Sequence, residues 1–193
     1  NPPIGIVLCA DKSDQVVKYT LPEDNNQIFA SKYKLYLPTE EEFKKELNLE
    51  NYVKKAIEER EQGISYMFVV IDKKTGELVG CTSFLDIVLP HKRLEIGSTW
   101  YTPSVWRTAI NTNCKFLLLQ YCFEVLQLHR VQIKTGHENT RSQQAIERIG
   151  AQKEGVLRNH MIKKEGTIRH TVMYSVILED WPQVKRRFID QLL

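Results

Sequence analysis

One segment of the chain joins a strand, a polar turn and a long helix in a way that suits a phosphate-bearing ligand. The strand spans Leu94 to Tyr101, the turn Thr102 to Asn111, and the helix Thr112 to Leu126. The first turn of a helix carries backbone N–H groups without helical partners, and the helix dipole makes this end positive. A diphosphate would suit this junction. Such junctions also occur as plain structural connections, so the junction alone leaves both interpretations open.

The hydrophobic pattern predicts the elements that position this junction. From residue 39 onward the order is helix, three strands, helix, strand, helix, two strands and helix. The predicted ranges are Thr39 to Gly63, Tyr66–Asp72, Leu78–Ile87, Leu94–Tyr101, Thr112–Leu126, His129–Thr135, Thr140–Ile149, Gln152–Ile162, Thr167–Leu178 and Pro182–Leu192, with further strands at Ile4–Leu8 and Gln27–Leu37.

Helices and strands mix without regular alternation, which predicts an α+β fold. We expect a twisted, mostly antiparallel sheet flanked by helices, with a parallel crossover between the strands at Leu94 and Val131. In the long helix, the apolar stripe is predicted to consist of Phe116, Leu119, Phe123 and Leu126.

Composition narrows the class of protein. The 193 residues suit one domain or one domain with a short appendage, and 42% hydrophobic residues can build one core. The net charge of +3 is too mild to indicate a nucleic-acid binder. Cys9, Cys81, Cys114 and Cys122 lack zinc spacing, so we expect no metal and four unpaired thiols in a reducing cytoplasm. Neither a membrane-spanning run nor a signal peptide is evident.

Two long runs carry a family resemblance. The first is Trp100-x-x-Pro-x-x-Trp-Arg-Thr-Ala-Ile-Asn-Thr-Asn-Cys-Lys-Phe-Leu-Leu-Leu, and the second extends from the Leu-Gln-Leu-His-Arg-Val segment through Asn139-x-x-Ser142. Together they resemble the cofactor-binding motifs of GNAT acetyltransferases, in the branch similar to ribosomal-protein alanine and serine N-acetyltransferases. The resemblance covers about Leu47 to Leu193. It implies that the strands around Leu94 and Val131 splay apart to admit the pantetheine arm of acetyl-CoA, a co-substrate.

The resemblance implies a set of cofactor-binding residues, namely Thr99, Trp100, Tyr101, Trp106, Arg107, Thr108, Ala109, Ile110, Asn111, Thr112, Asn139 and Ser142. The pyrophosphate loop departs from the usual Q/R-x-x-G-x-G/A pattern, because Trp106, Ala109 and Asn111 hold its defining positions. Ala109 is small and compatible with a helical conformation, so the loop can still approach phosphate. Arg107 could reach a phosphate or remain solvated.

The resemblance also implies direct transfer of the acetyl group to an amine. Glu95 lies where family members carry a general base, although it could equally be a surface carboxylate paired with Lys92 or Arg93. Ser142 matches the position proposed to protonate the CoA thiolate, and it also suits the first turn of a helix. Ile146 excludes a tyrosine acid four residues on. His160 and Tyr174 are candidates for the acceptor pocket or for packing.

Residues 1–47 resemble the C-terminal end of YhcG-type PD-(D/E)xK nuclease domains. The matching blocks are Asn-Pro-Pro-Ile-Gly-Ile-Val-Leu-Cys-Ala-Asp-Lys-Ser and Ala-Ser-Lys-Tyr-Lys-Leu-Tyr-Leu-Pro-Thr-Glu-Glu-Glu. The catalytic groups of such nucleases lie upstream of these blocks, so we expect no nuclease activity. We expect this segment to be a fusion remnant or to complete the sheet of an acetyltransferase domain at 48–193.

Two functional hypotheses follow. The first is a cytoplasmic N-acetyltransferase, monomeric or homodimeric, that acts on a protein N-terminus or a small amine without membrane or nucleic acid. The second is a catalytically weak CoA-binding or DNA-associated module derived from a nuclease-acetyltransferase fusion. Turnover of acetyl-CoA would separate them.

Overall fold

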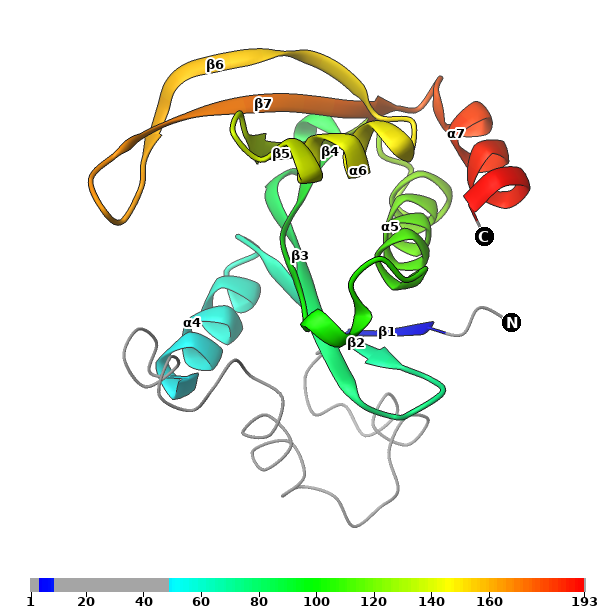
Figure 1. The fold of residues 1–193 in the computed structure, drawn as a ribbon, viewed down its shortest axis with the longest axis horizontal. Coiled ribbons are helices and arrows are strands. Elements are labelled where there is room, and N and C mark those ends of the chain that lie inside the picture. Colours follow the sequence, from blue (N-terminus) through cyan, green and yellow to red (C-terminus); the bar gives the residue numbers. More distant parts are fainter. Residues whose placement is uncertain (1–3, 9–48, 193) are drawn as a thin grey trace.

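A single mixed sheet forms the centre of the molecule (Figure 1). The computed structural model describes residues 4–8 and 49–192, so the predictions for Gln27–Leu37 and for the helix start at Thr39 lie outside the described residues. The strands follow the order β1-β2-β3-β4-β5-β7-β6. Among the described strands, only β4 and β5 pair in parallel. The bounds are β1 Ile4–Leu8, β2 Tyr66–Asp72, β3 Leu78–Val88, β4 Arg93–Tyr101, β5 Arg130–Gly136, β6 Gln152–Ile162 and β7 Ile168–Ile177.

The predicted α+β class and the parallel crossover are confirmed. The strand predicted at Ile4–Leu8 is β1, which pairs antiparallel with β2 at the edge of the sheet. The hairpin between β2 and β3 turns at Gly76, whose φ of 71° lies in the left-handed region that glycine adopts without strain. The Asp72 side chain accepts a hydrogen bond from the Lys74 N–H within the same turn. Local turn chemistry therefore fixes the register of this pair.

Helices flank the sheet, and α4 and α5 lie on opposite sides of β3 (Figure 1). The bounds are α4 Leu49–Glu61, α5 Ile110–Gln120, α6 Thr140–Arg148 and α7 Trp181–Arg187. As predicted, α4 ends before Gly63 and α6 before Gly150, both of which have a positive φ. A π-helical turn, η3 (Tyr121–Val125), extends α5, and another, η4 (Phe188–Leu192), extends α7.

The main core lies between α5 and the sheet, where Leu119 and Phe123 are buried as predicted. Phe116 is partly buried and packs against Trp181 and Phe188. The prediction for Leu126 is wrong, because its side chain is 41% exposed. The wider π-helical turn at Tyr121–Val125 rotates the residues that follow it away from the 3.6-residue stripe on which the prediction depended.

Strands β6 and β7 form a long, curved hairpin that arches past α6 and extends beyond the other strands (Figure 1). Its pairing slips between Leu157 and Met161, where Asn159 has a φ of 51°. The N–H of Asn159 donates to Nδ1 of His170 at 2.8 Å, which holds the bend in β6.

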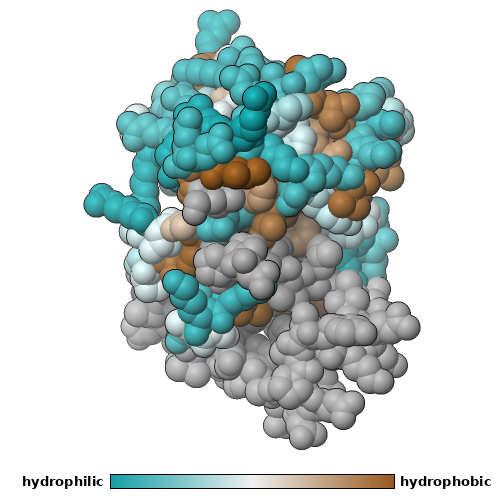
Figure 2. All heavy atoms as spheres, turned by 90° about the vertical axis from the view of Figure 1, so that its right-hand side faces the viewer, coloured by the Kyte–Doolittle hydropathy of each residue, from teal (hydrophilic) through white to brown (hydrophobic). Residues whose placement is uncertain are grey.

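The face that bears α5 and α7 is mostly hydrophilic, with separate hydrophobic areas between polar ones (Figure 2). Exposed apolar side chains on the π-helical turns that extend these helices include Val125 and Ile189. Within the described ranges, every helix is too short or too polar to cross a membrane. Cys81, Cys114 and Cys122 are free thiols.

Candidate functional site

The sheet opens between β4 and β5. These strands pair at three positions only, Arg93–Arg130, Leu94–Val131 and Glu95–Gln132. Beyond these pairs, β4 continues to Tyr101 and β5 continues to Gly136, but the two strands no longer pair with each other. The predicted splaying is confirmed, and it begins just past the pair formed by Glu95 and Gln132. The opening leaves two facing strand edges in the middle of the sheet.

The connection from β4 to α5 lies at this opening. It contains the 3-10 turn η2 (Pro103–Val105) and a left-handed residue, Arg107, with a φ of 64°. The helix begins at Ile110, two residues before the predicted start, and its first ladder bond runs from the Asn113 N–H to the Ala109 carbonyl at 2.9 Å. The N–H groups of Asn111 and Thr112 precede this bond. They point along the helix axis toward its N-terminal end, where an anion would bind.

The residues of this loop fit a diphosphate. Ala109 has φ −69° and ψ −9°, a helical conformation that a Cβ does not disturb. The first turn of α5 carries no acidic side chain, and neither does the first turn of α6. The side chains of Ile110 and Thr112 are buried, so these residues can meet a ligand only through the backbone. Thr108 turns its hydroxyl to the Val105 carbonyl at 2.7 Å.

A contact between two side chains connects the loop to α6. The guanidinium carbon of Arg141 lies 4.6 Å from the ring centroid of Trp106, which is 50% exposed. The Trp106 indole donates to the Tyr101 carbonyl at 2.9 Å. At the start of α6, the Asn139 side chain accepts a hydrogen bond from the Ser142 N–H at 3.0 Å. Asn139 is therefore the N-cap of α6, and Ser142 lies in its first turn.

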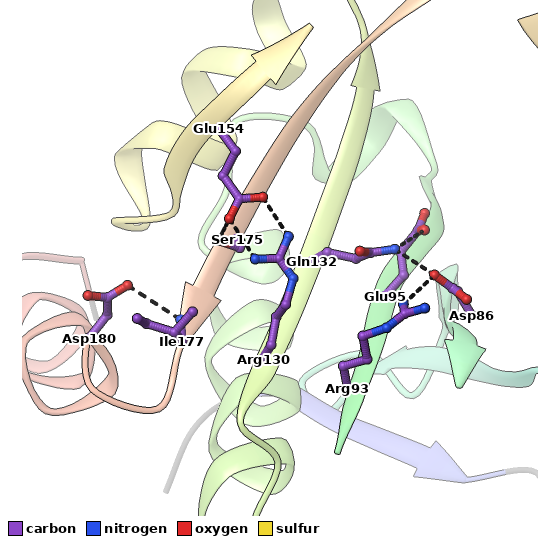
Figure 3. A network of polar contacts seen from close by, with 9 residues as sticks. All are labelled: Asp86, Arg93, Glu95, Arg130, Gln132, Glu154, Ser175, Ile177 and Asp180. Carbon is purple, nitrogen blue, oxygen red and sulfur yellow. Dashed lines mark hydrogen bonds and ion pairs between the residues drawn. The ribbon is translucent and has the colours of Figure 1, made fainter. Parts of the chain in front are cut away.

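Glu95 is buried rather than exposed, which corrects the expectation of a surface carboxylate paired with Lys92 or Arg93. Its carboxylate lies 2.6 Å from the Lys134 ammonium group and accepts from the Gln132 side chain at 3.3 Å. Arg93 instead pairs with Asp86 at 2.6 Å. Figure 3 shows Glu95 and Gln132 pointing toward each other from β4 and β5. The carboxylate thus lies at the point where the two strands separate.

A bulge interrupts β4 past this point. Ser98 has a φ of 46°, and β4 places Ser98 and Thr99 opposite the single residue Thr82 of β3. The hydroxyl groups of Thr82 and Thr99 are 2.8 Å apart, and the Lys115 ammonium group donates to the Thr99 hydroxyl at 2.8 Å. A β-bulge re-aims the backbone next to it, so the N–H groups here do not all follow the ladder.

A second feature lies on the β6–β7 hairpin. A hollow of about 850 Å³ is lined by Val156, Leu157, Arg158, Asn159, His160 and His170. His160 lies in it and places Nδ1 3.0 Å from the Thr171 hydroxyl. The basic residues among these are Arg158, His160 and His170. None of the residues that line the hollow carries a carboxylate.

Tyr174, a candidate for the acceptor pocket or for packing, is not among the residues that line this hollow. Its side chain is fully buried, and its hydroxyl donates to Glu147 of α6 at 2.8 Å. Burial and the Glu147 carboxylate raise the pKa of Tyr174 to about 12. The alternation of β7 places Tyr174 on the same face as Val172 and Val176, inside the core.

Three side chains at the opening were absent from the candidates that the sequence suggested. Lys134 could have been found, because it stands two residues after Gln132 and so shares its face of β5. Arg141 precedes Ser142 in a matched motif, but its contact with Trp106 depends on how α6 meets the loop. Lys115 lies in a mostly apolar helix segment, and a lysine there would ordinarily reach solvent.

Comparisons with known proteins agree with this geometry. The chain is 32% identical over 105 residues to the N-acetyltransferase YoaA of Bacillus subtilis (strain 168), whose name marks it as uncharacterized; the match covers 54% of this chain and 58% of YoaA. It is 31% identical over 106 residues to YdaF of the same strain, named as a ribosomal N-acetyltransferase, covering 55% of this chain and 57% of YdaF. The chain thus matches less than two thirds of the length of these relatives.

A solved structure extends the similarity to the whole chain. The GCN5-related N-acetyltransferase from Brucella melitensis has a TM-score of 0.75 and 29% identity, and the match covers 100% of this chain and 84% of that protein. A stretch of 47 residues is 47% identical to YhcG of Escherichia coli (strain K12), a protein named as a nuclease. It covers 24% of this chain and 12% of YhcG.

The family itself is identified by a match to the acetyltransferase (GNAT) domain over residues 14–152. That range is well over half of the 193 residues. It contains the opened strand pair, the loop before α5 and the capped start of α6. The chain therefore belongs to the GNAT acetyltransferase family.

Proposed function

We propose that this chain is an acetyl-CoA-dependent N-acetyltransferase that moves the acetyl group directly to an amine. The observation that carries the proposal is the opening between β4 and β5, flanked by the N-terminal ends of α5 and α6. Such ends favour negative charge, and neither first turn contains a carboxylate that would repel it. Arg107 and Arg141 add cationic groups at the same end of the opening.

In this proposal, each element has a separate task. The N–H groups of Asn111 and Thr112 bind the pyrophosphate, with Trp106, Arg107, Thr108, Ala109 and Ile110 forming the loop around it. Residues Thr99 to Tyr101 border the acetyl end. Asn139 holds the start of α6 in place and brings Ser142 to the opening. The Ser142 hydroxyl, for which the described residues provide no hydrogen-bond partner, supplies the proton to the departing CoA thiolate.

Glu95 is the proposed general base. An attacking amine must lose a proton, and an α-amine with a pKa near 7.7–8.0 is far easier to deprotonate than a lysine near 10.4. A buried carboxylate at the strand separation can accept that proton directly or through one water. The neutral amine then attacks the thioester carbonyl, and the C–N bond forms. The C–S bond breaks as the thiolate leaves with the Ser142 proton, and the proton that the new amide nitrogen loses restores the Ser142 hydroxyl. Backbone donors near the β4 bulge stabilise the oxyanion that forms between these steps.

The acceptor is proposed to be a protein N-terminus or a small amine. The relative YdaF, whose name refers to ribosomal acetylation, supports a protein N-terminus. The basic hollow at His160 supports an acceptor that carries a negative group near its amine.

One observation favours the second hypothesis, a weakly catalytic CoA-binding module. Glu95 already forms a 2.6 Å ion pair with Lys134, so the Lys134 ammonium group occupies a carboxylate oxygen that an incoming amine or water would have to reach. On this reading, the chain binds CoA without rapid turnover.

Calorimetric titration with acetyl-CoA and with CoA tests the proposal first. Dissociation constants in the micromolar range are expected for both ligands. A panel of N-terminal peptides and small amines is then assayed by the release of free thiol. Binding with turnover supports the enzyme, binding without turnover supports the second hypothesis, and no binding by the folded chain rejects both.

A further inference from the structure

Lys115 is a buried cation without a carboxylate partner among the described residues. Its side chain extends from α5 toward the sheet, and the residue is only 7% exposed. None of the ion pairs in the described part of the chain includes it, and its ammonium group donates to the Thr99 hydroxyl. A charged group in such a place destabilises the fold, because it leaves water without gaining an opposite charge.

Burial lowers the pKa of Lys115 to about 8, and the neighbouring Cys114 thiol opposes this shift. A methionine of similar length would avoid this cost and would still fill the space between α5 and the sheet. Packing therefore does not explain a lysine at this position. Its hydrogen-bond partner points to another explanation.

That partner belongs to the bulge of β4. Thr99 receives the Lys115 hydrogen bond and lies 2.8 Å from the Thr82 hydroxyl, so Lys115, Thr99 and Thr82 form a chain from α5 to β3. Thr99 is exposed, although Lys115 and Thr82 on either side of it are buried. This hydrogen-bonded series therefore reaches the protein surface at Thr99, beyond the last residue of β4 that pairs with β5.

The contact constrains the Thr99 hydroxyl. An ammonium group can only donate, so the Thr99 oxygen must accept from Lys115. Its own proton can go to the Thr82 hydroxyl at 2.8 Å, to the Gly97 carbonyl at 3.4 Å or to a ligand in the opening. The left-handed Ser98 beside it is costly for a residue other than glycine and persists only where neighbours hold it.

We propose that Lys115 is a positioning residue for acetyl transfer, which through Thr99 holds the β4 bulge in the form that stabilises the thioester oxyanion. This inference rests on the proposed function. The ammonium charge behind the bulge adds a favourable field where negative charge develops, in a place that excludes water. The destabilising burial of Lys115 is then explained by its effect on the transition state.

The test compares Lys115→Met with Lys153→Met, a matched change at an exposed position of β6. We expect Lys115→Met to lower kcat by about 10- to 100-fold, a smaller loss than the 10²–10³-fold seen when a direct oxyanion donor is removed. The KM for acetyl-CoA should change less than about 3-fold, and the melting temperature should stay or rise. Lys153→Met should match the wild type in all three measurements.

Thr99 provides an independent arm of the test. Thr99→Val removes the hydroxyl and should reproduce the loss of kcat, whereas Thr99→Ser should retain most of the activity. The double variant Lys115→Met/Thr99→Val should be no worse than either single variant, because both changes break one chain of contacts. If Lys115→Met does not fold, the Thr99 pair still decides the question.

The outcomes separate this inference from the proposed function. A wild type that neither binds acetyl-CoA nor releases thiol rejects the proposed function and the inference with it. If the wild type turns over acetyl-CoA and Lys115→Met or Thr99→Val has the same kcat, the inference is rejected and the proposed function stands. If Lys115→Met lowers both kcat and the melting temperature, Lys115 acts through the stability of the fold. This result also rejects the inference.

Discussion

The ammonium group of Lys134 lies 2.6 Å from a carboxylate oxygen of Glu95, so an ion pair joins β5 to β4 where the two strands stop pairing. Glu95 is almost fully buried, while the Lys134 side chain is 27% exposed. Lys134 therefore keeps some contact with solvent, and Glu95 keeps almost none. Glu95 can therefore serve either to hold β4 against β5 or to accept a proton during catalysis. Substitution of each partner in turn separates these two roles.

Glu95→Gln should lower kcat by about 10²–10⁴-fold, the usual range for loss of a general base, with little change in the KM for acetyl-CoA. Lys134→Gln breaks the same ion pair but leaves the carboxylate, so it is the matched control. Steady-state assays with a fixed amine measure both. Equal losses in the two variants would mean that Glu95 serves only to hold the strands together.

Lys115 should make the stability of the protein depend on pH. Its pKa is lowered from 10.5 to about 8, so between these values the unfolded chain binds more protons than the folded one. The free energy of unfolding therefore gains up to roughly 3 kcal/mol from this residue as the pH rises from 8 to 10.5. Burial raises the pKa values of Tyr101 and Cys122, whose effect on stability is opposite.

Comparison with Lys115→Met isolates the contribution of Lys115, because the opposing groups are common to both proteins. Urea unfolding at a series of pH values measures the difference between them. The stability advantage of Lys115→Met should be largest below pH 8 and should shrink above it. A difference that does not change with pH would show that Lys115 titrates normally.

Gly80→Ala should destabilise the sheet severely. A Cβ at Gly80 would collide with the backbone carbonyl oxygen of Trp100 and crowd the Tyr101 ring, so β3 and β4 would have to move apart. Overpacking of this kind costs about 1–3 kcal/mol or more. Gly155→Ala is the control, because a Cβ at Gly155 meets nothing within 4 Å. Equal melting temperatures for Gly80→Ala and Gly155→Ala would contradict the tight pairing of β3 with β4.

Trp106→Ala and Arg141→Ala should each weaken acetyl-CoA binding, and their effects should not add. The guanidinium group stacks on the indole, a contact worth about 0.5–1 kcal/mol at exposed sites. Calorimetric titration of both single variants and the double variant completes the cycle. Fully additive effects would show that the loop and α6 bind the ligand independently.

Local pattern predicted most of the fold. The strands Tyr66–Asp72 and Gln152–Ile162 have the predicted bounds, because turn residues delimit their alternating side chains. Asn139 and Ser142 also lie where the motif places them, since N-capping depends on adjacent residues. The opening of the sheet was implied by family resemblance rather than by any periodicity.

The side-chain environments were less predictable, because they depend on contacts between distant segments. Glu95 and Lys134 meet only through the register of a parallel pair, and sequence does not reveal that register. The sequence left Tyr174 open between a pocket and packing, and its burial with a hydrogen bond to Glu147 of α6 depends on how that helix lies on β7. Lys115 is buried and donates to Thr99 of β4, a contact between distant segments that no pattern within α5 shows.

The parting of β4 from β5 gives the sheet two internal edges whose main-chain groups face each other across a gap. An extended molecule that contains amide groups can fit between such edges as an added strand does. The pantetheine arm of acetyl-CoA has this chemistry. A ligand held by main-chain atoms is insensitive to the identity of the side chains beside it. On the proposed function, main-chain contacts of this kind would let the site keep Trp106, Ala109 and Asn111 in place of the usual loop residues, and amino-acid replacement along these edges should alter the choice of acceptor sooner than the choice of acyl donor.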